Sequence, residues 1–235
     1  SLRPGQGRRA QPARMRALLA FLLLLMPLVS GLGAPGAVRS AGLARRDIGR
    51  RLRAVPRDRS TTAALVGATD AAAPAAFQAM LRDHPGLATL VFVECPGTYD
   101  DRANLALGRL IRAAGVVAWV PEGGSVRSGA VELVLAGTAL RIDDRAEFAV
   151  HAWLDEDGRQ ARDYAADSPE NRKYLAYYRE MGMTAAQATA FYSMTNSVPF
   201  DEALWLDGAE MRRWIGRGDV SAPRLAHLDL SAALN

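Results

Sequence analysis

One serine and one histidine in this chain are spaced so that they could act together in acyl transfer. Ser128 follows the turn at Gly123 and Gly124 and precedes Gly129, at the expected start of a helix, and His151 comes 23 residues later at the end of an apolar strand. A helix start offers unpaired N–H groups and a positive dipole end, both of which favour an oxyanion beside the serine. An imidazole can take the proton of the serine hydroxyl during attack. The pattern therefore predicts Ser128 as a nucleophile and His151 as its general base.

Each of these residues also has a structural interpretation. Serine is a common N-cap residue, so Ser128 could serve only to begin the helix. A histidine at a strand end is often a hydrogen-bonded structural residue. The other two histidines, His84 and His227, stand in polar loop segments, so His151 is the histidine that we expect in a site.

The single cysteine has a structural interpretation too. Cys95 ends the apolar stretch 90–93, and no second cysteine is present to form a disulfide with it. We interpret it as a small buried side chain and not as a nucleophile. The histidines are scattered, with no cysteine or carboxylate at ligand spacing, so we expect neither a metal site nor a cofactor.

Strands and helices alternate from about residue 62. The apolar patterns predict strands at 63–66, 87–95, 116–120, 140–142 and 147–153, and helices at 73–82, about 107–114, 128–137, 170–181, 184–195 and 208–215, with an acidic loop at 154–169. Two strand-to-helix turns, at 91–98 and 123–129, contain glycine. Strands separated by helices predict an α/β fold with a mainly parallel sheet covered on both faces.

Composition favours one folded domain without a nucleic-acid partner. The 235 residues are 49% hydrophobic, enough for one well-buried core. Residues 1–46 hold eight arginines and no acid, so all 25 acids and 21 of the 29 bases follow, and residues 47–235 carry a net charge of −4. The domain therefore lacks the cationic surface that phosphate binding needs.

The N-terminal segment has the pattern of an export signal. Several arginines precede the apolar run 17–28, which is followed by small residues; the run is short for a membrane span and suits a signal peptide. We expect residues 1–37 to be an export signal, cleaved near Ala34 or Ala37 or kept as a membrane anchor. Residues 38–60 are expected to form a linker, and residues 61–235 the catalytic domain of a periplasmic or secreted protein.

Four short motifs occur in an order that resembles a known family. They are Pro96-Gly97-Thr98 before a helix, Ser128 at a helix start, the LAG sequence at 135–137, and His151 on the following hairpin. Their order and spacing resemble the proteolytic subunit of Clp protease, within the ClpP/crotonase superfamily. With the stretch 174–211, the chain is most similar to the exported, predicted periplasmic branch of that group. The resemblance covers about residues 62–215.

The resemblance implies a fold and a set of catalytic residues. The fold is α/β, with a mainly parallel sheet of repeated ββα units and flanking helices. Ser128 corresponds to the nucleophile and His151 to the general base. The third member is an acid in the loop before the last helix, for which Asp201 is the first choice and Glu202 the second.

The resemblance also implies an oxyanion hole and a function. The N–H of Gly129, with that of Gly97 or Thr98, corresponds to the oxyanion hole. The implied activity is that of an exported serine hydrolase, a peptidase, acting on a peptide or acyl substrate and assembled as a homo-oligomer.

Two other functions remain open. The residue before Ser128 is Arg127, where the family's peptidases have a small residue. A charged side chain there fits a non-catalytic binding protein that retains the fold. An enzyme acting on acyl-coenzyme-A thioesters is the third interpretation, because it would use the same two oxyanion amides without a serine–histidine pair.

Overall fold

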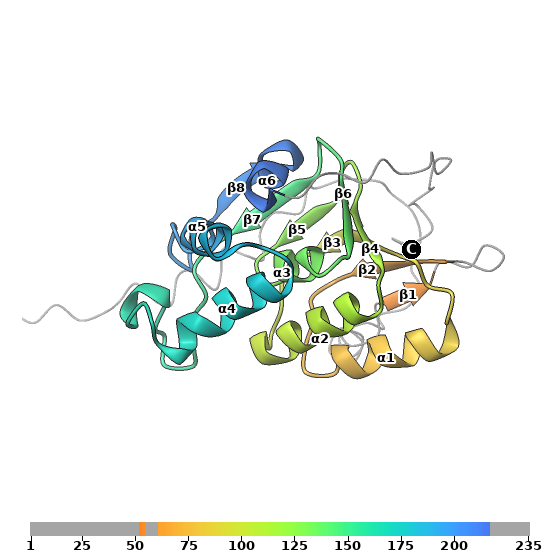
Figure 1. The fold of residues 1–235 in the computed structure, drawn as a ribbon, viewed down its shortest axis with the longest axis horizontal. Coiled ribbons are helices and arrows are strands. Elements are labelled where there is room, and N and C mark those ends of the chain that lie inside the picture. Colours follow the sequence, from red (N-terminus) through yellow and green to blue (C-terminus); the bar gives the residue numbers. More distant parts are fainter. Residues whose placement is uncertain (1–51, 55–60, 217–235) are drawn as a thin grey trace, which may run out of the picture. The chain divides into compact units, whose positions relative to one another are not determined.

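The computed structural model describes residues 52–54 and 61–216 (Figure 1). The predicted export signal at 1–37 lies outside the described residues, as does most of the predicted linker. In the described ranges no helix is long and apolar enough to cross a membrane.

The described strands form one eight-stranded sheet. The strands are β1 (Leu52–Ala54), β2 (Thr62–Val66), β3 (Thr89–Cys95), β4 (Val117–Val120), β5 (Ser125–Arg127), β6 (Ala139–Ile142), β7 (Glu147–Val150) and β8 (Leu204–Asp207). Every pair is parallel except β1 with β2 and β7 with β8, at the two ends of the strand order. The prediction of a mainly parallel sheet is confirmed.

The sheet divides at β3, and this division creates the repeated ββα units. The first half of β3 pairs with β4, whereas its last two residues, Glu94 and Cys95, pair with β5. The next strands repeat the arrangement, because β6 pairs with β4 and β7 pairs with β5. As a result β3, β5 and β7 run parallel to one another, with their carboxyl ends at the same edge of the sheet.

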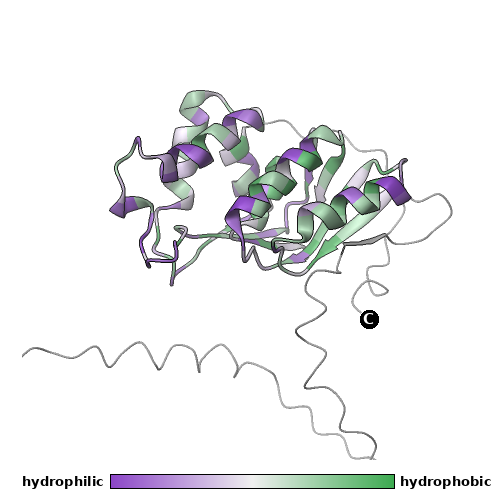
Figure 2. Cartoon of the chain, turned by 90° about the horizontal axis from the view of Figure 1, so that it is seen from below, coloured by the Kyte–Doolittle hydropathy of each residue, from purple (hydrophilic) through white to green (hydrophobic). Residues whose placement is uncertain are grey.

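Six α-helices flank the sheet in the described part (Figure 1). They are α1 (Ala73–Asp83), α2 (Asp101–Ala113), α3 (Ala130–Leu135), α4 (Pro169–Glu180), α5 (Ala185–Thr195) and α6 (Gly208–Ile215). Helix α2 begins where Asp100 accepts a hydrogen bond from the Ala103 amide, and it buries Leu107 and Ile111 completely. Figure 2 shows hydrophobic residues along the strands and purple, hydrophilic patches along the helices.

Several predicted boundaries are right and others need correction. The four helices predicted at 73–82, 170–181, 184–195 and 208–215 are present within two residues of the expected limits. Thr184 is the N-cap of α5, as expected, and forms a capping box with Gln187. Cys95 is buried, and its thiol donates a hydrogen bond to the Leu65 carbonyl at 3.3 Å.

Three short strands were not predicted. Residues 125–127 form β5 before α3, so the helix begins at Ala130 and not at 128. Residues 204–207 form β8, in a segment expected to be a loop, and residues 52–54 of the predicted linker form β1. Each has only three or four residues and exists because a neighbouring strand supplies its hydrogen bonds, which a local pattern cannot indicate.

Candidate active site

The predicted serine lies in a strained turn between β5 and α3. Its amide donates to the Ala149 carbonyl of β7 at 2.8 Å, and its own carbonyl accepts from the Val131 amide at 3.0 Å. Ser128 has a φ of 49° and is the only non-glycine residue with positive φ among those that the structure describes. This conformation costs about 1 kcal/mol in an L residue, and such strain is concentrated at functional sites.

The parallel strands bring the predicted residues to one place. Gly97 and Thr98 follow β3, Ser128 follows β5, and His151 follows β7. Because these three strands are neighbours and parallel, the residues after them meet at one edge of the sheet, where α/β proteins bind their ligands. The strand predicted to reach residue 153 ends at Val150, which places His151 in the loop beyond that edge.

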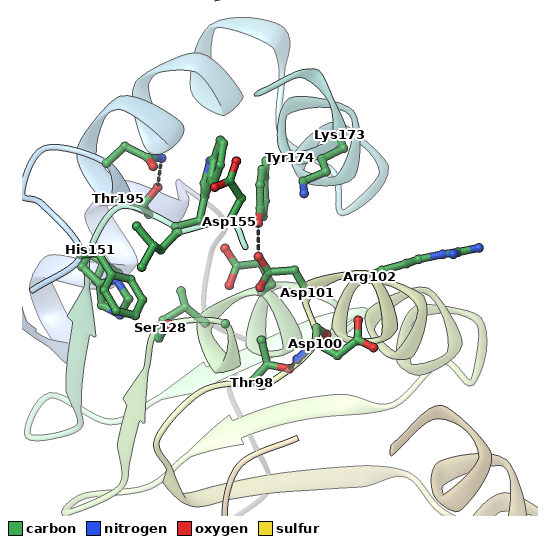
Figure 3. Close-up of a pocket in the computed structure, with 18 of the residues that line it drawn as sticks. Thr98, Asp100, Asp101, Arg102, Ser128, His151, Asp155, Lys173, Tyr174 and Thr195 are labelled. Atoms are coloured by element: carbon green, nitrogen blue, oxygen red, sulfur yellow. Dashed lines mark hydrogen bonds between the residues drawn. The ribbon is translucent and has the colours of Figure 1, made fainter. Parts of the chain in front are cut away.

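A cavity of about 600 Å³ opens at this edge (Figure 3). Ser128, Gly129, Thr98 and His151 all line it. Its far wall comes from α4, α5 and the loop after β7. Residues up to 102 positions apart in the chain, from Thr98 to Phe200, thus surround one space, large enough for a peptide side chain or a small acyl compound.

His151 is oriented by the backbone. Its Nδ1 lies 2.9 Å from the carbonyl oxygen of Ala152, and the Phe200 ring meets the imidazole edge to face at 5.0 Å. When Nδ1–H donates to that carbonyl, Nε2 of the neutral ring is free to accept a proton. In this structure no hydrogen bond joins Ser128 Oγ to the imidazole, which is common in catalytic sites that hold no ligand.

The two predicted acids do not reach the imidazole. Asp201 and Glu202 are exposed, and neither lines the cavity or hydrogen-bonds to His151. The loop is the expected one, but it directs Phe200 at the ring, and the Ala152 carbonyl occupies the position at Nδ1 that an acid would take.

The predicted oxyanion amides belong to turns that lie beside the serine. Among the described residues, the N–H groups of Gly97, Thr98 and Gly129 have no hydrogen-bond acceptor. Gly97 has a φ of 131°, and a Cβ there would stand 3.0 Å from Ser128 Cβ. Only glycine therefore allows the first turn to approach the serine so closely.

A buried polar link holds the two turns together. The Asn104 side chain donates to the Gly129 carbonyl at 2.6 Å, and the Thr69 hydroxyl donates to Asn104 Oδ1 at 2.9 Å. Gly129 also packs against Thr98, since a Cβ at Gly129 would come within 2.6 Å of the threonine methyl. The sequence offered little sign of Asn104, which is one polar residue within an amphipathic helix.

Arg127 points away from the reaction space. It forms an ion pair with Glu94 and a hydrogen bond of 2.7 Å with Ser125, and it does not line the cavity. The charge of Arg127 therefore does not enter the lining of the cavity. Because its side chain is held by Glu94 and Ser125 outside the cavity lining, its bulk does not restrict access to the cavity.

Sequence reasoning missed two carboxyl groups in the cavity. Glu132, one turn after Ser128 on α3, accepts a hydrogen bond from the Tyr178 hydroxyl at 2.8 Å, and Asp101 accepts one from Tyr174 at 2.7 Å. Burial raises the pKa of Glu132 to about 7. The available signal was a lone glutamate in the otherwise apolar segment 130–136. The structure describes no group of three or more side chains arranged to hold a metal ion.

Comparisons with known proteins concern the fold. No protein family's sequence profile matches the chain, and no curated protein matches its sequence. Among solved structures, the 1510-N membrane-bound stomatin-specific protease is 14% identical with a TM-score of 0.45, the match covering 65% of this chain and 74% of that one. A variant of that protease in complex with a substrate peptide is 12% identical with a TM-score of 0.41, covering 64% of this chain and 71% of that one.

A third solved structure comes from a different enzyme class. A probable enoyl-CoA hydratase/isomerase from Mycobacterium abscessus is 14% identical with a TM-score of 0.40, and the match covers 65% of this chain and 63% of that one. Identities and TM-scores this low leave the activity open. The chain is an α/β protein with a mostly parallel, divided sheet.

Proposed function

We propose that this protein is a serine hydrolase that forms an acyl-enzyme on Ser128 and acts on peptides. The observation that carries the proposal is the strained conformation of Ser128, which lies next to turns with unpaired amides and lines a cavity that His151 also lines. Strain of this kind persists where the surrounding structure imposes it. Here β7 imposes it, through the hydrogen bond from Ser128 N to Ala149.

The arrangement supports a sequence of steps in which protons and bonds balance. Ser128 Oγ attacks the substrate carbonyl while its proton passes to His151 Nε2, and the N–H groups of Gly129 and Thr98 stabilise the oxyanion. The imidazolium then gives its proton to the departing amine. A water activated by the neutral imidazole releases the acid product and restores the serine. The Ala152 carbonyl holds Nδ1–H throughout.

Labelling with a fluorophosphonate probe tests the proposal directly. The full-length chain should label, and both Ser128→Ala and His151→Ala should abolish labelling while leaving the circular dichroism spectrum unchanged. Ser193→Ala is the matched control, because Ser193 is exposed on α5 and does not line the cavity. A chain that folds but does not label, or that labels equally without Ser128, would refute the hydrolase function.

A binding protein is the second candidate. Its supporting observation is that no hydrogen bond joins Ser128 Oγ to the His151 imidazole in this structure, an arrangement that a protein binding without reacting would also have. Absence of labelling together with saturable binding of a ligand in the cavity would support this function. An enzyme for coenzyme A thioesters is not favoured, because five carboxylates line the cavity and would repel a polyanionic cofactor.

A further inference from the structure

The cavity beside Ser128 has an excess of negative charge. Its lining includes five carboxylates (Asp100, Asp101, Glu132, Asp155 and Glu156) against two permanent cations, Arg102 and Lys173. Figure 3 shows the Arg102 side chain extending away from the other labelled residues. The interior of the cavity is therefore electronegative, and a low-dielectric cleft strengthens such a field.

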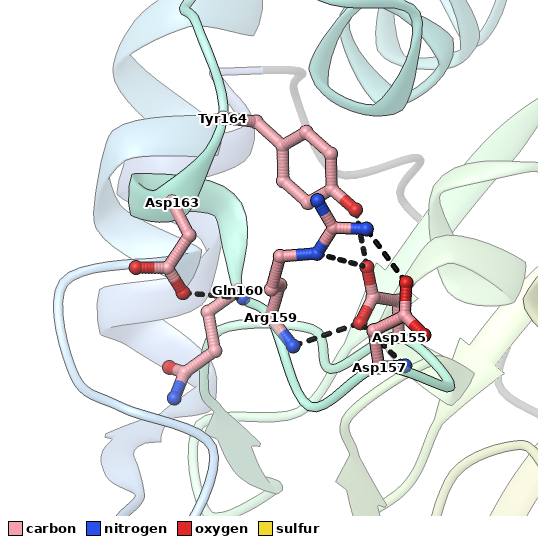
Figure 4. A network of polar contacts seen from close by, with 6 residues as sticks. All are labelled: Asp155, Asp157, Arg159, Gln160, Asp163 and Tyr164. Atoms are coloured by element: carbon pink, nitrogen blue, oxygen red, sulfur yellow. Dashed lines mark hydrogen bonds and ion pairs between the residues drawn. The ribbon is translucent and has the colours of Figure 1, made fainter.

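Not all of these carboxylates are available to a ligand. Asp155 accepts hydrogen bonds from Tyr164 and from the Arg159 amide, and its carboxylate also pairs with the Arg159 guanidinium (Figure 4). The hydrogen bond from Tyr164 lowers the pKa of Asp155. Asp100 accepts the Ala103 amide at the start of α2. Asp155 and Asp100 are therefore already hydrogen-bonded within the loop after β7 and at the start of α2. The buried acid Glu132 remains to contact a ligand in the cavity.

Glu132 is the one buried acid among the described residues that line the cavity. It is only 8% exposed, and the Tyr178 hydroxyl donates to its carboxyl group at 2.8 Å. Within the described residues no cationic side chain pairs with this carboxyl group. A buried carboxylate without a cationic partner is costly, so Glu132 favours a ligand that brings a positive charge.

The opposite wall is aromatic and already accommodates an ammonium group. The rings of Trp153 and Tyr174 are stacked at 6.1 Å, and Tyr192 stacks on Tyr174 at 5.8 Å. Lys173 Nζ lies 5.0 Å from the centre of the Tyr174 ring and 5.5 Å from that of Trp153. Aromatic faces attract cations, so this wall and the Glu132 carboxylate offer complementary contacts to one cationic group.

We propose that this cavity is a specificity pocket for a basic side chain, lysine or arginine, of a peptide substrate. The cationic group would donate to Glu132 while its carbon chain lies along Trp153 and Tyr174. This inference rests on the proposed function, since a specificity pocket requires the nucleophile Ser128 at its edge. Hydrolysis would then occur at a bond next to a basic residue.

Binding of benzamidine to the full-length chain, measured by isothermal titration calorimetry at about pH 8, tests the pocket. Benzamidine is a planar arginine mimic, and benzamide is the matched neutral compound of the same shape. We expect benzamidine to bind at least about tenfold more tightly than benzamide, and Glu132→Gln to remove about tenfold in affinity, as loss of a charge-assisted hydrogen bond does. Glu147→Gln, an exposed acid of β7 outside the cavity, should change nothing.

Two further measurements keep the test decisive. Fluorophosphonate labelling and benzamidine binding are measured separately on the unmodified chain, so charge-selective binding without labelling would refute hydrolysis and leave the pocket standing. Lys173→Met removes a competing cation from an exposed position and should tighten benzamidine binding several-fold. This result does not depend on whether the Glu132 variant folds. Equal binding of the charged and neutral compounds, or unchanged or weaker binding in Lys173→Met, would overturn the specificity pocket.

Discussion

Replacing Glu132 by glutamine should stabilise the protein at neutral pH and not in acid. The glutamine oxygen can still accept the hydrogen bond from Tyr178, and the volume is unchanged, so the substitution removes little except the charge. The pKa of Glu132 is raised by its burial, an effect that the Tyr178 hydrogen bond opposes and the negative charge of Asp101 adds to. The benefit of the substitution therefore depends on whether the wild-type carboxyl is ionised.

The sign follows from the protons bound in each state. Between pH 4.5, the ordinary pKa of a glutamate, and about 7, the folded chain keeps the Glu132 proton that the unfolded chain releases. The unfolded state binds fewer protons in this window, so the free energy of unfolding falls as pH rises through it and stays lower above it. At about 1.4 kcal/mol for each pH unit, the loss amounts to about 3 kcal/mol.

Urea unfolding followed by tryptophan fluorescence provides the measurement. The free energy of unfolding of Glu132→Gln minus that of the wild type should increase by about 3 kcal/mol between about pH 4 and about pH 8. Because only the change of this difference with pH is used, any effect of the glutamine amide on stability that does not depend on pH cancels. Glu147→Gln, an exposed control, should show almost no such change. A flat difference for Glu132→Gln would mean that this carboxyl ionises at its ordinary pKa, and would refute the argument from burial.

Four more predictions follow from the sequence and the fold. Ser128→Gly should raise the free energy of unfolding by about 1 kcal/mol in urea titrations, because glycine tolerates the φ of 49°; Ser128→Ala should not, and an equal gain from both would exclude strain as the cause. Gly108→Ala should cost about 1–3 kcal/mol by the same assay, since a Cβ there would overlap the Tyr177 hydroxyl; a neutral effect would mean that α2 and α4 separate easily. Asp201→Asn should change the rate of fluorophosphonate labelling by less than about threefold, because His151 Nδ1 is held by a backbone carbonyl; a loss of orders of magnitude would restore the acid role of Asp201. Fusing residues 15–40 to a reporter that folds only outside the cytoplasm should give an active reporter, and a reporter left in the cytoplasm would remove the proposal of export.

The chain's local patterns were enough to predict the fold class and the helices that cover the sheet. Amphipathic spacing and caps are properties of neighbouring residues, so the limits of α1, α4, α5 and α6 could be predicted within two residues. The order of Ser128 and His151 after successive strands was also readable, because a parallel sheet collects its strand ends at one edge. Burial of Cys95 followed from the apolar strand that it ends.

Tertiary contacts decided what those patterns could not. β5 has three residues and owes its existence to β3 and β7 on either side, and its pairing forces Ser128 into a strained turn ahead of α3. The loop before α6 was predicted to supply an acid, yet β8 pairs antiparallel with β7 and leaves Asp201 exposed while Phe200 meets His151. In the sequence, Glu132 is a single acid within an apolar helix, and that pattern does not indicate that α4 buries it. Its burial and its raised pKa depend on residues some 45 positions away, and distances across a chain are determined only when it folds.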